Sequence, residues 1–166
     1  MEINLEELFI EQDKLNKVIF EKHNITSYNE VLNELVLALY VEIGELANEI
    51  RSFKYWSIKP SSSEETILDE YADCVHFIIS LCLAFNENND FNINDGIIKI
   101  NDKKEITSYL KKLFSTLDNA ISTKKMSSWF SDFIDFGYLL GFDIEKIKKA
   151  YFKKHDVNIE RQKTNY

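Results

Sequence analysis

Two short stretches of this sequence decide its fold, VEIGELANEI at residues 41–50 and DEYADCVHF at residues 69–77. Each is apolar except for acidic residues spaced three apart, which lie on one face of a helix with Cβ atoms about 5–6 Å apart. The spaced acids are Glu42 and Glu45, then Glu70 and Asp73. A short connection makes neighbouring helices antiparallel, so the sequence predicts a helix pair that brings four carboxylates together.

A metal ion is the simplest reason to keep four carboxylates in apolar surroundings. Unpaired carboxylates repel one another and lose hydration when buried. A divalent cation removes both costs, and hard oxygen ligands suit Mg²⁺ or Mn²⁺. A di-iron centre would need Glu-x-x-His on two helices, whereas this chain offers a single related pattern, Asp73-x-x-His76. We therefore expect Mg²⁺, with Mn²⁺ as the alternative.

Composition excludes several other classes of protein. The 166 residues are 45% hydrophobic, enough for one domain with a core, and one Pro and four Gly argue against a turn-dense β-sandwich. The net charge of −8 disfavours attraction to nucleic acid or an anionic membrane. The N-terminus lacks a signal-peptide pattern, and Cys74 and Cys82 read as reduced thiols. We expect a cytoplasmic protein without nucleic-acid or membrane partners.

The spacing of apolar residues predicts an all-α, bundle-like fold of about five to six helices. They are expected after Asn4, over 28–52 behind a capping box at Ser27, over 63–85 behind a capping box at Ser62, from Asp102 towards Leu117, from Ser127 to Leu140, and from Ile144, capped by Asp143, to about Gln162. The second and third are apolar nearly all round, which predicts central, buried helices. Residues 86–96 read as a polar loop. We expect a single domain, 1–166, with the weakly patterned segment 87–125 as a candidate variable insertion.

Polar side chains at the two ends of the chain form two further candidate binding groups. Lys154, Asn158 and Arg161 are four and three residues apart and share a helix face. Arg can grip a phosphate through two bonds, and Lys adds a point charge. Gln12 and Asn16 offer amide donors and acceptors, which suit the edge of a base. The plainer alternatives are a solvated basic helix face and ordinary surface amides.

With these residues in view, the sequence resembles the all-α NTP pyrophosphatases and, within them, the dimeric dUTPases. The resemblance rests on QDKLN at 12–16, EIGELANE at 42–49, FKYWS at 53–57, EYADCVHF at 70–77 and YFKKHDVNIERQ at 151–162. It covers the chain except for about 87–125. Two positions depart from the family pattern: His155 replaces a usual Asn, and the ending KTNY replaces a common x-x-Gly-Tyr.

The resemblance implies a role for each candidate residue. The metal ligands would be Glu42, Glu45, Glu70 and Asp73, holding two Mg²⁺ ions. The catalytic residue would be Glu45, which orients or deprotonates the attacking water. The substrate-binding residues would be Gln12 and Asn16 at the uracil, Trp56, His76 and Phe77 around the nucleoside, and Lys154, Asn158 and Arg161 at the phosphates.

The leading hypothesis is a Mg²⁺-dependent dUTP diphosphatase that forms dUMP and pyrophosphate as a homodimer, with dUDP as a further candidate substrate. A related pyrophosphatase that prefers dCTP or another nucleotide is one alternative. A phage-type interaction protein that binds a bacterial repressor, with 87–125 as the partner surface, is another. We also expect residues 151–166 to be mobile without nucleotide and to close over the phosphates when it binds.

Overall fold

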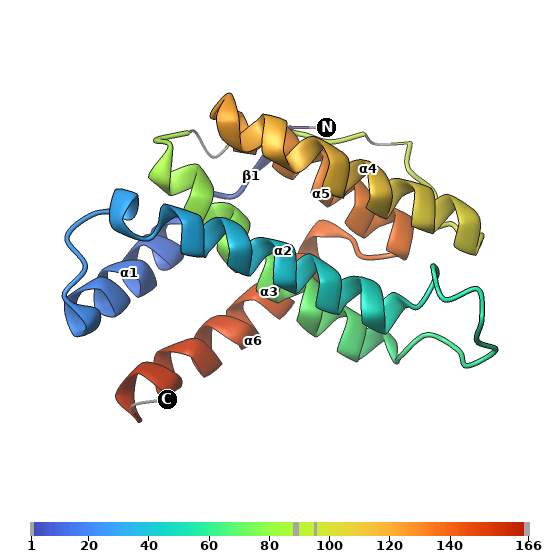
Figure 1. The fold of residues 1–166 in the computed structure, drawn as a ribbon, viewed down its shortest axis with the longest axis horizontal. Coiled ribbons are helices and arrows are strands. Elements are labelled where there is room, and N and C mark those ends of the chain that lie inside the picture. The colour runs from blue at the N-terminus through green and yellow to red at the C-terminus, as the bar shows by residue number, and fades with distance from the viewer. Residues whose placement is uncertain (1, 88–89, 95, 165–166) are drawn as a thin grey trace.

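The structure is a computed structural model that describes residues 2–87, 90–94 and 96–164. Within these residues the fold is helical, as the apolar spacing predicts (Figure 1). The elements are β1 (Glu2–Asn4), α1 (Glu6–His23), the 3₁₀ turn η1 (Tyr28–Glu30), α2 (Leu32–Ile50), α3 (Glu64–Ala84), β2 (Asp90–Asn92), α4 (Lys103–Ser122), α5 (Met126–Leu140) and α6 (Ile144–Lys163).

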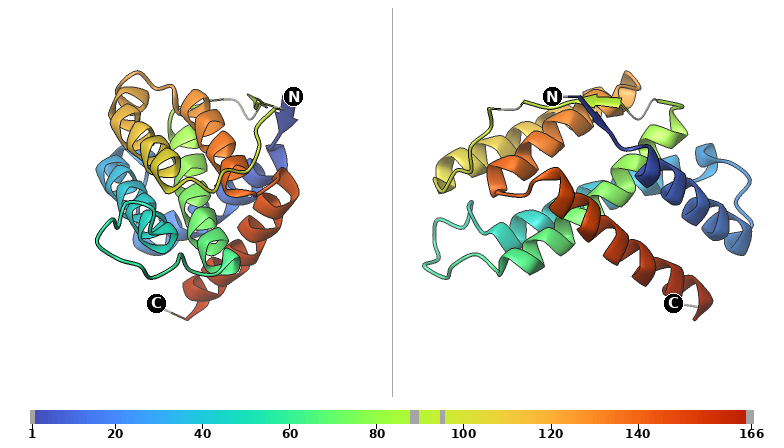
Figure 2. Two further views of the ribbon diagram at one scale, coloured as in Figure 1. Left: turned by 90° about the vertical axis from the view of Figure 1, so that its right-hand side faces the viewer. Right: turned by 180° about the vertical axis from the view of Figure 1, so that it is seen from behind.

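Helix α3 is the centre of the molecule. It packs against α1, α2, α5 and α6, and Figure 2 shows it passing between the α4–α5 pair and α6. Its middle consists of buried side chains from Tyr71 to Cys82 apart from the half-buried Asp73 and Phe77. Helix α5 approaches it closely at Gly137, where an added Cβ would lie 2.6 Å from the Tyr71 hydroxyl oxygen. The central position predicted for this helix is confirmed.

The start of α3 differs from the prediction by one residue. Ser63 is the N-cap, and its hydroxyl accepts a hydrogen bond from the Thr66 backbone N–H at 3.2 Å. The predicted cap, Ser62, instead donates its hydroxyl to the Glu49 carboxylate at the end of α2. Only Ser62, with Glu65 three residues on, satisfies the capping-box spacing, but its contact with Glu49 leaves the cap to Ser63.

Two expectations for α2 are wrong. Tyr28–Glu30 forms a 3₁₀ turn rather than the first turn of the helix, because the Glu30 carboxylate accepts hydrogen bonds from the backbone and hydroxyl of Thr26 instead of completing a capping box. The helix is also not buried all round, since Leu37 is 64% exposed and Val41 is 50% exposed. The apolar outer face of α2 is therefore open in the single chain.

The segment 87–125 contains more structure than its pattern predicts. Part of the expected polar loop forms β2, which pairs antiparallel with β1, while residues 88, 89 and 95 lie outside the described part of the chain. Helix α4 buries Leu110, Leu113 and Leu117 in the common core. Whether the segment is an insertion stays a prediction, but it is part of the same hydrophobic core.

The remaining helix ends mostly follow the sequence. Asp102 and Asp143 cap α4 and α6 as expected, and Gly141 ends α5 with a φ of +92°. The expected cap at Ser127 is different: the Glu87 carboxylate accepts hydrogen bonds from the backbone of Met126 and Ser127 at 2.7 and 2.8 Å. A carboxylate from a distant segment supplies this cap, so the local sequence could not reveal it.

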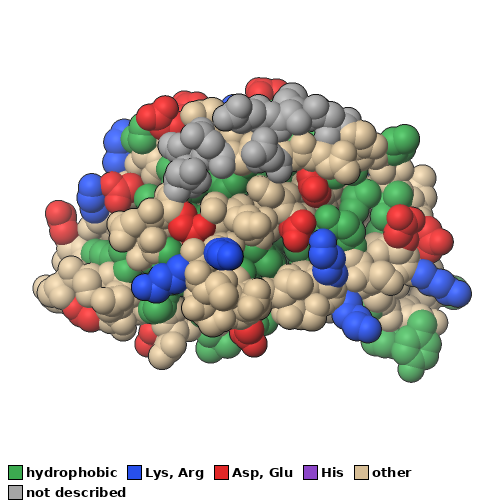
Figure 3. Space-filling model, turned by 90° about the horizontal axis from the view of Figure 1, so that it is seen from above, with side chains coloured by type: hydrophobic (Ala, Val, Ile, Leu, Met, Phe, Trp, Pro, Cys, Tyr) green, Lys and Arg blue, Asp and Glu red, His purple; other side chains and the backbone are tan. Residues whose placement is uncertain are grey.

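Acidic and basic side chains are interspersed on the face seen from above the α4–α5 pair (Figure 3). Within the described residues, no helix has the length and apolar character needed to cross a bilayer.

Candidate functional site

Three of the four predicted acids meet where α2 packs on α3. Glu42, Glu45 and Glu70 each offer a carboxylate oxygen, and these oxygens lie within 4.8 Å of one another. Glu42 and Glu70 are half-buried, and Glu45 is exposed. The i, i+3 spacing on antiparallel helices thus brings three of the four predicted acids together.

The cluster carries negative charge at an energetic cost. Burial, followed by repulsion from Asp73, Glu45 and Glu70, raises the pKa of Glu42 to about 7. Burial also raises the pKa of Glu70, and the charge of Asp73 adds to the effect. Carboxylates in such surroundings are stabilised in their charged form by a nearby cation. The donor set, all hard carboxylate oxygens, fits a divalent ion such as Mg²⁺ or Mn²⁺.

The fourth acid, Asp73, is paired with Lys154 from α6. The Lys154 Nζ lies 2.6 Å from Asp73 Oδ2 and 2.7 Å from Asp69 Oδ2. Burial lowers the pKa of Lys154, but the hydrogen bonds to Asp69 and Asp73 outweigh it, so the net shift is upward. Asp69 was missed in the sequence, although it lies four residues before Asp73 on the same helix face. Lys154, expected at the phosphates, is here the counter-ion of the acidic helix.

An open cleft of about 690 Å³ adjoins the acidic cluster and is walled by α1, α2, α3 and α6. It is lined by all but one of the predicted site residues: Gln12, Asn16, Glu42, Glu45, Glu70, Asp73, His76, Phe77, Lys154, Asn158 and Arg161. Residues from both ends of the chain therefore reach one cavity. A smaller pocket of about 260 Å³ lies elsewhere, between Ile50 and Phe142, and contains none of these residues.

Trp56 is the exception. It lies in the connection between α2 and α3, is 65% exposed, and packs edge-on against Tyr55 with ring centroids 5.1 Å apart. Within the described part of the chain it does not line the cleft. Its proposed contact with the nucleoside stays a prediction.

The predicted amide pair is buried at the inner wall of the cleft. Gln12 and Asn16 are 3% and 6% exposed, and Gln12 Nε2 donates to Asn16 Oδ1 at 2.9 Å. Asn16 Nδ2 donates to the Tyr28 hydroxyl at 3.0 Å and to Ser80 Oγ at 3.1 Å. Tyr28 and Ser80 come from segments distant in sequence, and no motif signalled them.

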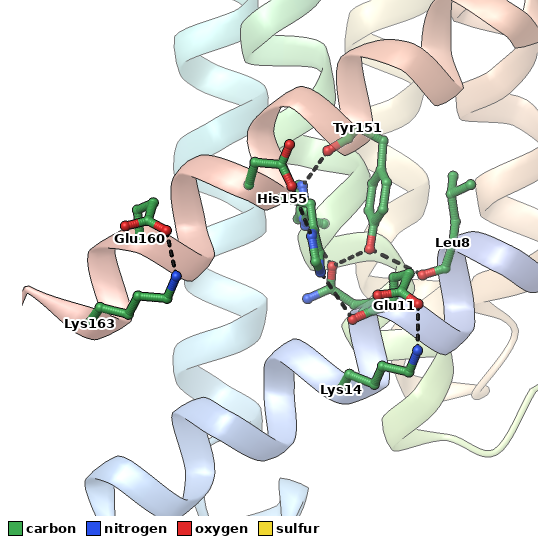
Figure 4. A network of polar contacts seen from close by, with 10 residues as sticks. Leu8, Glu11, Lys14, Tyr151, His155, Glu160 and Lys163 are labelled. Carbon is green, nitrogen blue, oxygen red and sulfur yellow. Dashed lines mark hydrogen bonds and ion pairs between the residues drawn. The ribbon is translucent and has the colours of Figure 1, made fainter.

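His76 adjoins the amide pair as a buried, neutral ring. Burial lowers its pKa to about 3, and its ring stacks on Tyr151 of α6 with centroids 4.2 Å apart. His155, which replaces the family's usual Asn, lies one turn further along α6, with its Nε2 3.3 Å from the Glu11 carbonyl oxygen. Figure 4 shows Tyr151 and His155 on α6 facing Leu8 and Glu11 on α1. Since an Asn amide can also donate to a carbonyl, the replacement keeps this kind of contact available.

The far end of α6 also borders the cleft. Arg161 Nη1 donates to Asn158 Oδ1 at 3.4 Å, so the two side chains share a face, as their spacing predicts. Lys22 of α1 donates to the Gln162 carbonyl oxygen. The helix is continuous to Lys163, and whether its end moves with nucleotide stays a prediction.

The match to a known family covers almost the whole chain. A family model described as dUTPase matches residues 4–166, including the segment 87–125 that the motifs do not cover. Among curated proteins, none matches the chain.

Proposed function

The chain belongs to the all-α dUTPase family and is a dUTP diphosphatase, and we propose that it hydrolyses dUTP to dUMP and pyrophosphate in the cleft between α1, α2, α3 and α6. One observation supports this location above the others. The cleft holds a carboxylate cluster, a buried amide pair and cationic side chains of α6 on its walls. A nucleoside triphosphate needs the same three elements: a metal site, a base reader and phosphate contacts.

We assign Mg²⁺ as the metal, with Mn²⁺ as the alternative. Glu42, Glu45 and Glu70 would hold two such ions, and Asp73 would join them once Lys154 leaves its carboxylate. The high pKa of Glu42, caused by burial and neighbouring acids, supports a cation at this position. When bound, such ions neutralise phosphate charge and acidify water.

Glu45 is our candidate for the catalytic carboxylate. It is the exposed member of the cluster, so it can reach a water molecule from the cleft while Glu42 and Glu70 remain half-buried. A carboxylate in hydrogen-bond reach of the attacking water can orient it or accept its proton. Among the described residues that line the cleft there is no Cys. Ser80 donates to the His76 backbone carbonyl, and the His76 ring contacts Gln12 and Tyr151, so these side chains do not form a Ser–His–Asp triad, and hydrolysis by water requires none.

The substrate would lie along the cleft with its base at α1 and its phosphates at α6. Gln12 and Asn16 would bind the uracil edge, and the half-buried Phe77 would contact the base or sugar. Lys154, Asn158 and Arg161 would bind the phosphates, Lys154 by exchanging Asp73 for phosphate oxygens. The same contacts would accept dUDP with one phosphate fewer.

We further propose that the active form is a homodimer. Leu37 and Val41 expose apolar surface on α2, and Ile10 and Val18 do so on α1. A second copy of the chain would remove such surface from water, which is favourable by about 25 cal/mol per Å². Within one chain Trp56 does not line the cleft, so a substrate contact would require that its connection moves or that a second copy presents it.

A substrate panel tests the proposed function. Initial rates are measured for dUTP, dCTP, dTTP and dATP, each with Mg²⁺ and with a chelator. We expect hydrolysis of dUTP well above the others and only with the metal. Equal rates for dUTP and dCTP would favour the related pyrophosphatase with a broader or different base preference.

A further inference from the structure

A chain of buried hydrogen bonds links α6 to the amide pair. Two groups approach the Gln12 Oε1 atom: the Tyr151 hydroxyl at 3.0 Å and His76 Nδ1 at 2.6 Å. The Tyr151 hydroxyl has a single proton, which it shares between Gln12 Oε1 and the Leu8 carbonyl oxygen 3.1 Å away (Figure 4). Gln12, His76 and Tyr151 are each less than 5% exposed, so water does not replace these contacts.

The direction of these hydrogen bonds depends on which ring nitrogen of His76 carries its proton. The ring is neutral because burial lowers its pKa to about 3, and a neutral imidazole has a single N–H. Both neighbours of the ring are oxygens: Gln12 Oε1 is 2.6 Å from Nδ1, and the Tyr151 carbonyl oxygen is 3.3 Å from Nε2. An amide or backbone carbonyl oxygen can only accept, so the single proton belongs to the shorter contact. His76 therefore donates from Nδ1 to Gln12.

The orientation of the Gln12 amide then fixes the orientation of the Asn16 amide. Because the Gln12 oxygen faces two donors, its nitrogen faces Asn16 Oδ1 at 2.9 Å. The Asn16 nitrogen then donates to Ser80 Oγ at 3.1 Å. Ser80 has one hydroxyl proton, which it donates to the His76 carbonyl oxygen at 2.9 Å in preference to Asn16 Oδ1 at 3.3 Å, so its own oxygen can accept from Asn16. All of these hydrogen bonds are therefore consistent with one orientation of the two amides.

This direction gives the amide pair a definite hydrogen-bonding pattern. Gln12 Nε2 carries two hydrogens and uses one on Asn16, and Asn16 Oδ1 has two lone pairs. The pair thus offers a donor beside an acceptor. Uracil presents the matching acceptor O4 beside the donor N3–H, whereas cytosine presents a donor N4–H₂ beside the acceptor N3. With both amides turned over, the same pair would match cytosine.

We propose that Tyr151 and His76 are positioning residues that fix the direction of the Gln12–Asn16 amides and so select uracil over cytosine. This inference rests on the proposed function, since it requires the two amides to contact the base. It assigns specificity to two side chains that act through Gln12 rather than on the substrate, one of them on α6.

Substitution of Tyr151 tests whether its hydroxyl orients the Gln12 and Asn16 amides. Tyr151→Phe keeps the ring that stacks on His76 and removes one of the two donors to Gln12. Tyr71→Phe is the matched control, because Tyr71 is equally buried and its hydroxyl donates to the Phe133 carbonyl at 2.8 Å, away from the amides. The measurement is kcat/KM for dUTP divided by kcat/KM for dCTP. We expect Tyr151→Phe to lower this ratio by about tenfold, the scale of one buried hydrogen bond, and Tyr71→Phe to leave it unchanged.

The outcomes separate the inference from the function on which it rests. An unchanged ratio in Tyr151→Phe, in a protein that prefers dUTP, overturns the inference alone. An equal fall of the ratio in both variants overturns it as well, because the loss of either buried hydroxyl would then lower selectivity through a general loss of packing order. An unmodified protein without preference for dUTP overturns both the inference and the proposed uracil selection.

A spectroscopic measurement on the unmodified protein gives a second test that needs no variant to fold. The ¹⁵N shifts of His76 distinguish a protonated ring nitrogen from a bare one. We expect Nδ1 to carry the proton and Nε2 to be bare. A proton on Nε2 would overturn the inference, because His76 would then donate to the Tyr151 carbonyl and Gln12 would have to turn its nitrogen towards Nδ1.

Discussion

At the scale of single residues, Glu42 shows how the acidic cluster depends on its surroundings. The same carboxyl in an unfolded chain has a pKa near 4.5, and in the folded protein burial and three neighbouring acids raise the pKa to about 7. The sequence predicts that these acids meet, because helix spacing fixes which side chains share a face. It could not predict that Asp73 pairs with Lys154, since that contact depends on how α6 lies across α3.

The raised pKa of Glu42 predicts how stability depends on pH. A carboxyl with a higher pKa in the folded state binds its proton more tightly there, so it stabilises the fold at low pH and loses this effect as the pH rises from about 4.5 to about 7. We expect the Tm of the metal-free protein to fall over this window, and to fall less in Glu42→Gln. Calorimetric scans at several pH values would show this. Parallel curves for the two proteins would contradict it.

Glu45 carries the prediction for catalysis. Glu45→Gln keeps the shape of the side chain but removes its charge and its ability to accept a proton. We expect kcat to fall by about 10²-fold or more, the scale of a lost general base, in a folded protein. Glu65→Gln is the control, because Glu65 is an exposed acid that pairs with Lys153 on the surface. Near-normal turnover in Glu45→Gln would remove Glu45 from the mechanism.

At the scale of elements, some helix starts are capped by the residue directly before the helix, and others are capped by a distant segment of the chain. Asp102 and Asp143 cap the helices that immediately follow them, so the sequence alone predicts them. The start of α5 is capped by Glu87, which lies 39 residues before Met126 and 40 residues before Ser127, the two residues whose backbone N–H groups it binds. Likewise β1 is too short to be recognised without its partner β2. Local rules predict an element only when its stabilising contacts are also local.

The contact between α6 and α3 predicts a link between Lys154 and metal affinity. Lys154 neutralises Asp73, so Lys154→Met should free that carboxylate for the metal. We expect calorimetry without nucleotide to show Mg²⁺ binding about tenfold tighter, because Asp73 loses the cation that competes with the metal, while KM for dUTP rises. Lys153→Met is the control on the same helix, since Lys153 pairs with the exposed Glu65. Weaker Mg²⁺ binding in Lys154→Met would contradict the linkage.

The packing of α6 also indicates which part of residues 151–166 is expected to close over the phosphates. Tyr151, Lys154 and His155 are buried, whereas the helix beyond them is half-buried or exposed. We expect amide exchange to be slow through His155 without nucleotide, faster beyond it, and slowed there by a non-hydrolysable dUTP analogue. Arg161→Ala should raise KM and leave the metal-free Tm nearly unchanged. Slow exchange throughout, unaltered by the analogue, would make α6 purely structural.

At the scale of the whole molecule, the apolar outer face of α2 bears on assembly. The sequence predicts apolar residues around most of α2 but cannot say whether the chain or a second copy covers them, and the structure leaves Leu37 and Val41 exposed. We expect the protein to sediment as a dimer, and Leu37→Glu with Val41→Glu to shift it towards monomer, because a buried charge without a partner is costly. A monomeric unmodified protein, or a charged variant that remains dimeric, would exclude this face as the interface.

The most direct measurement of the central claim is product identification from dUTP. With Mg²⁺, the account predicts dUMP and pyrophosphate in equal amounts from the first turnovers, little product with a chelator, and the same loss in Glu45→Gln. Release of single phosphates through dUDP, or undiminished pyrophosphate release in the presence of the chelator, would contradict a metal-dependent diphosphatase centred on Glu42, Glu45 and Glu70.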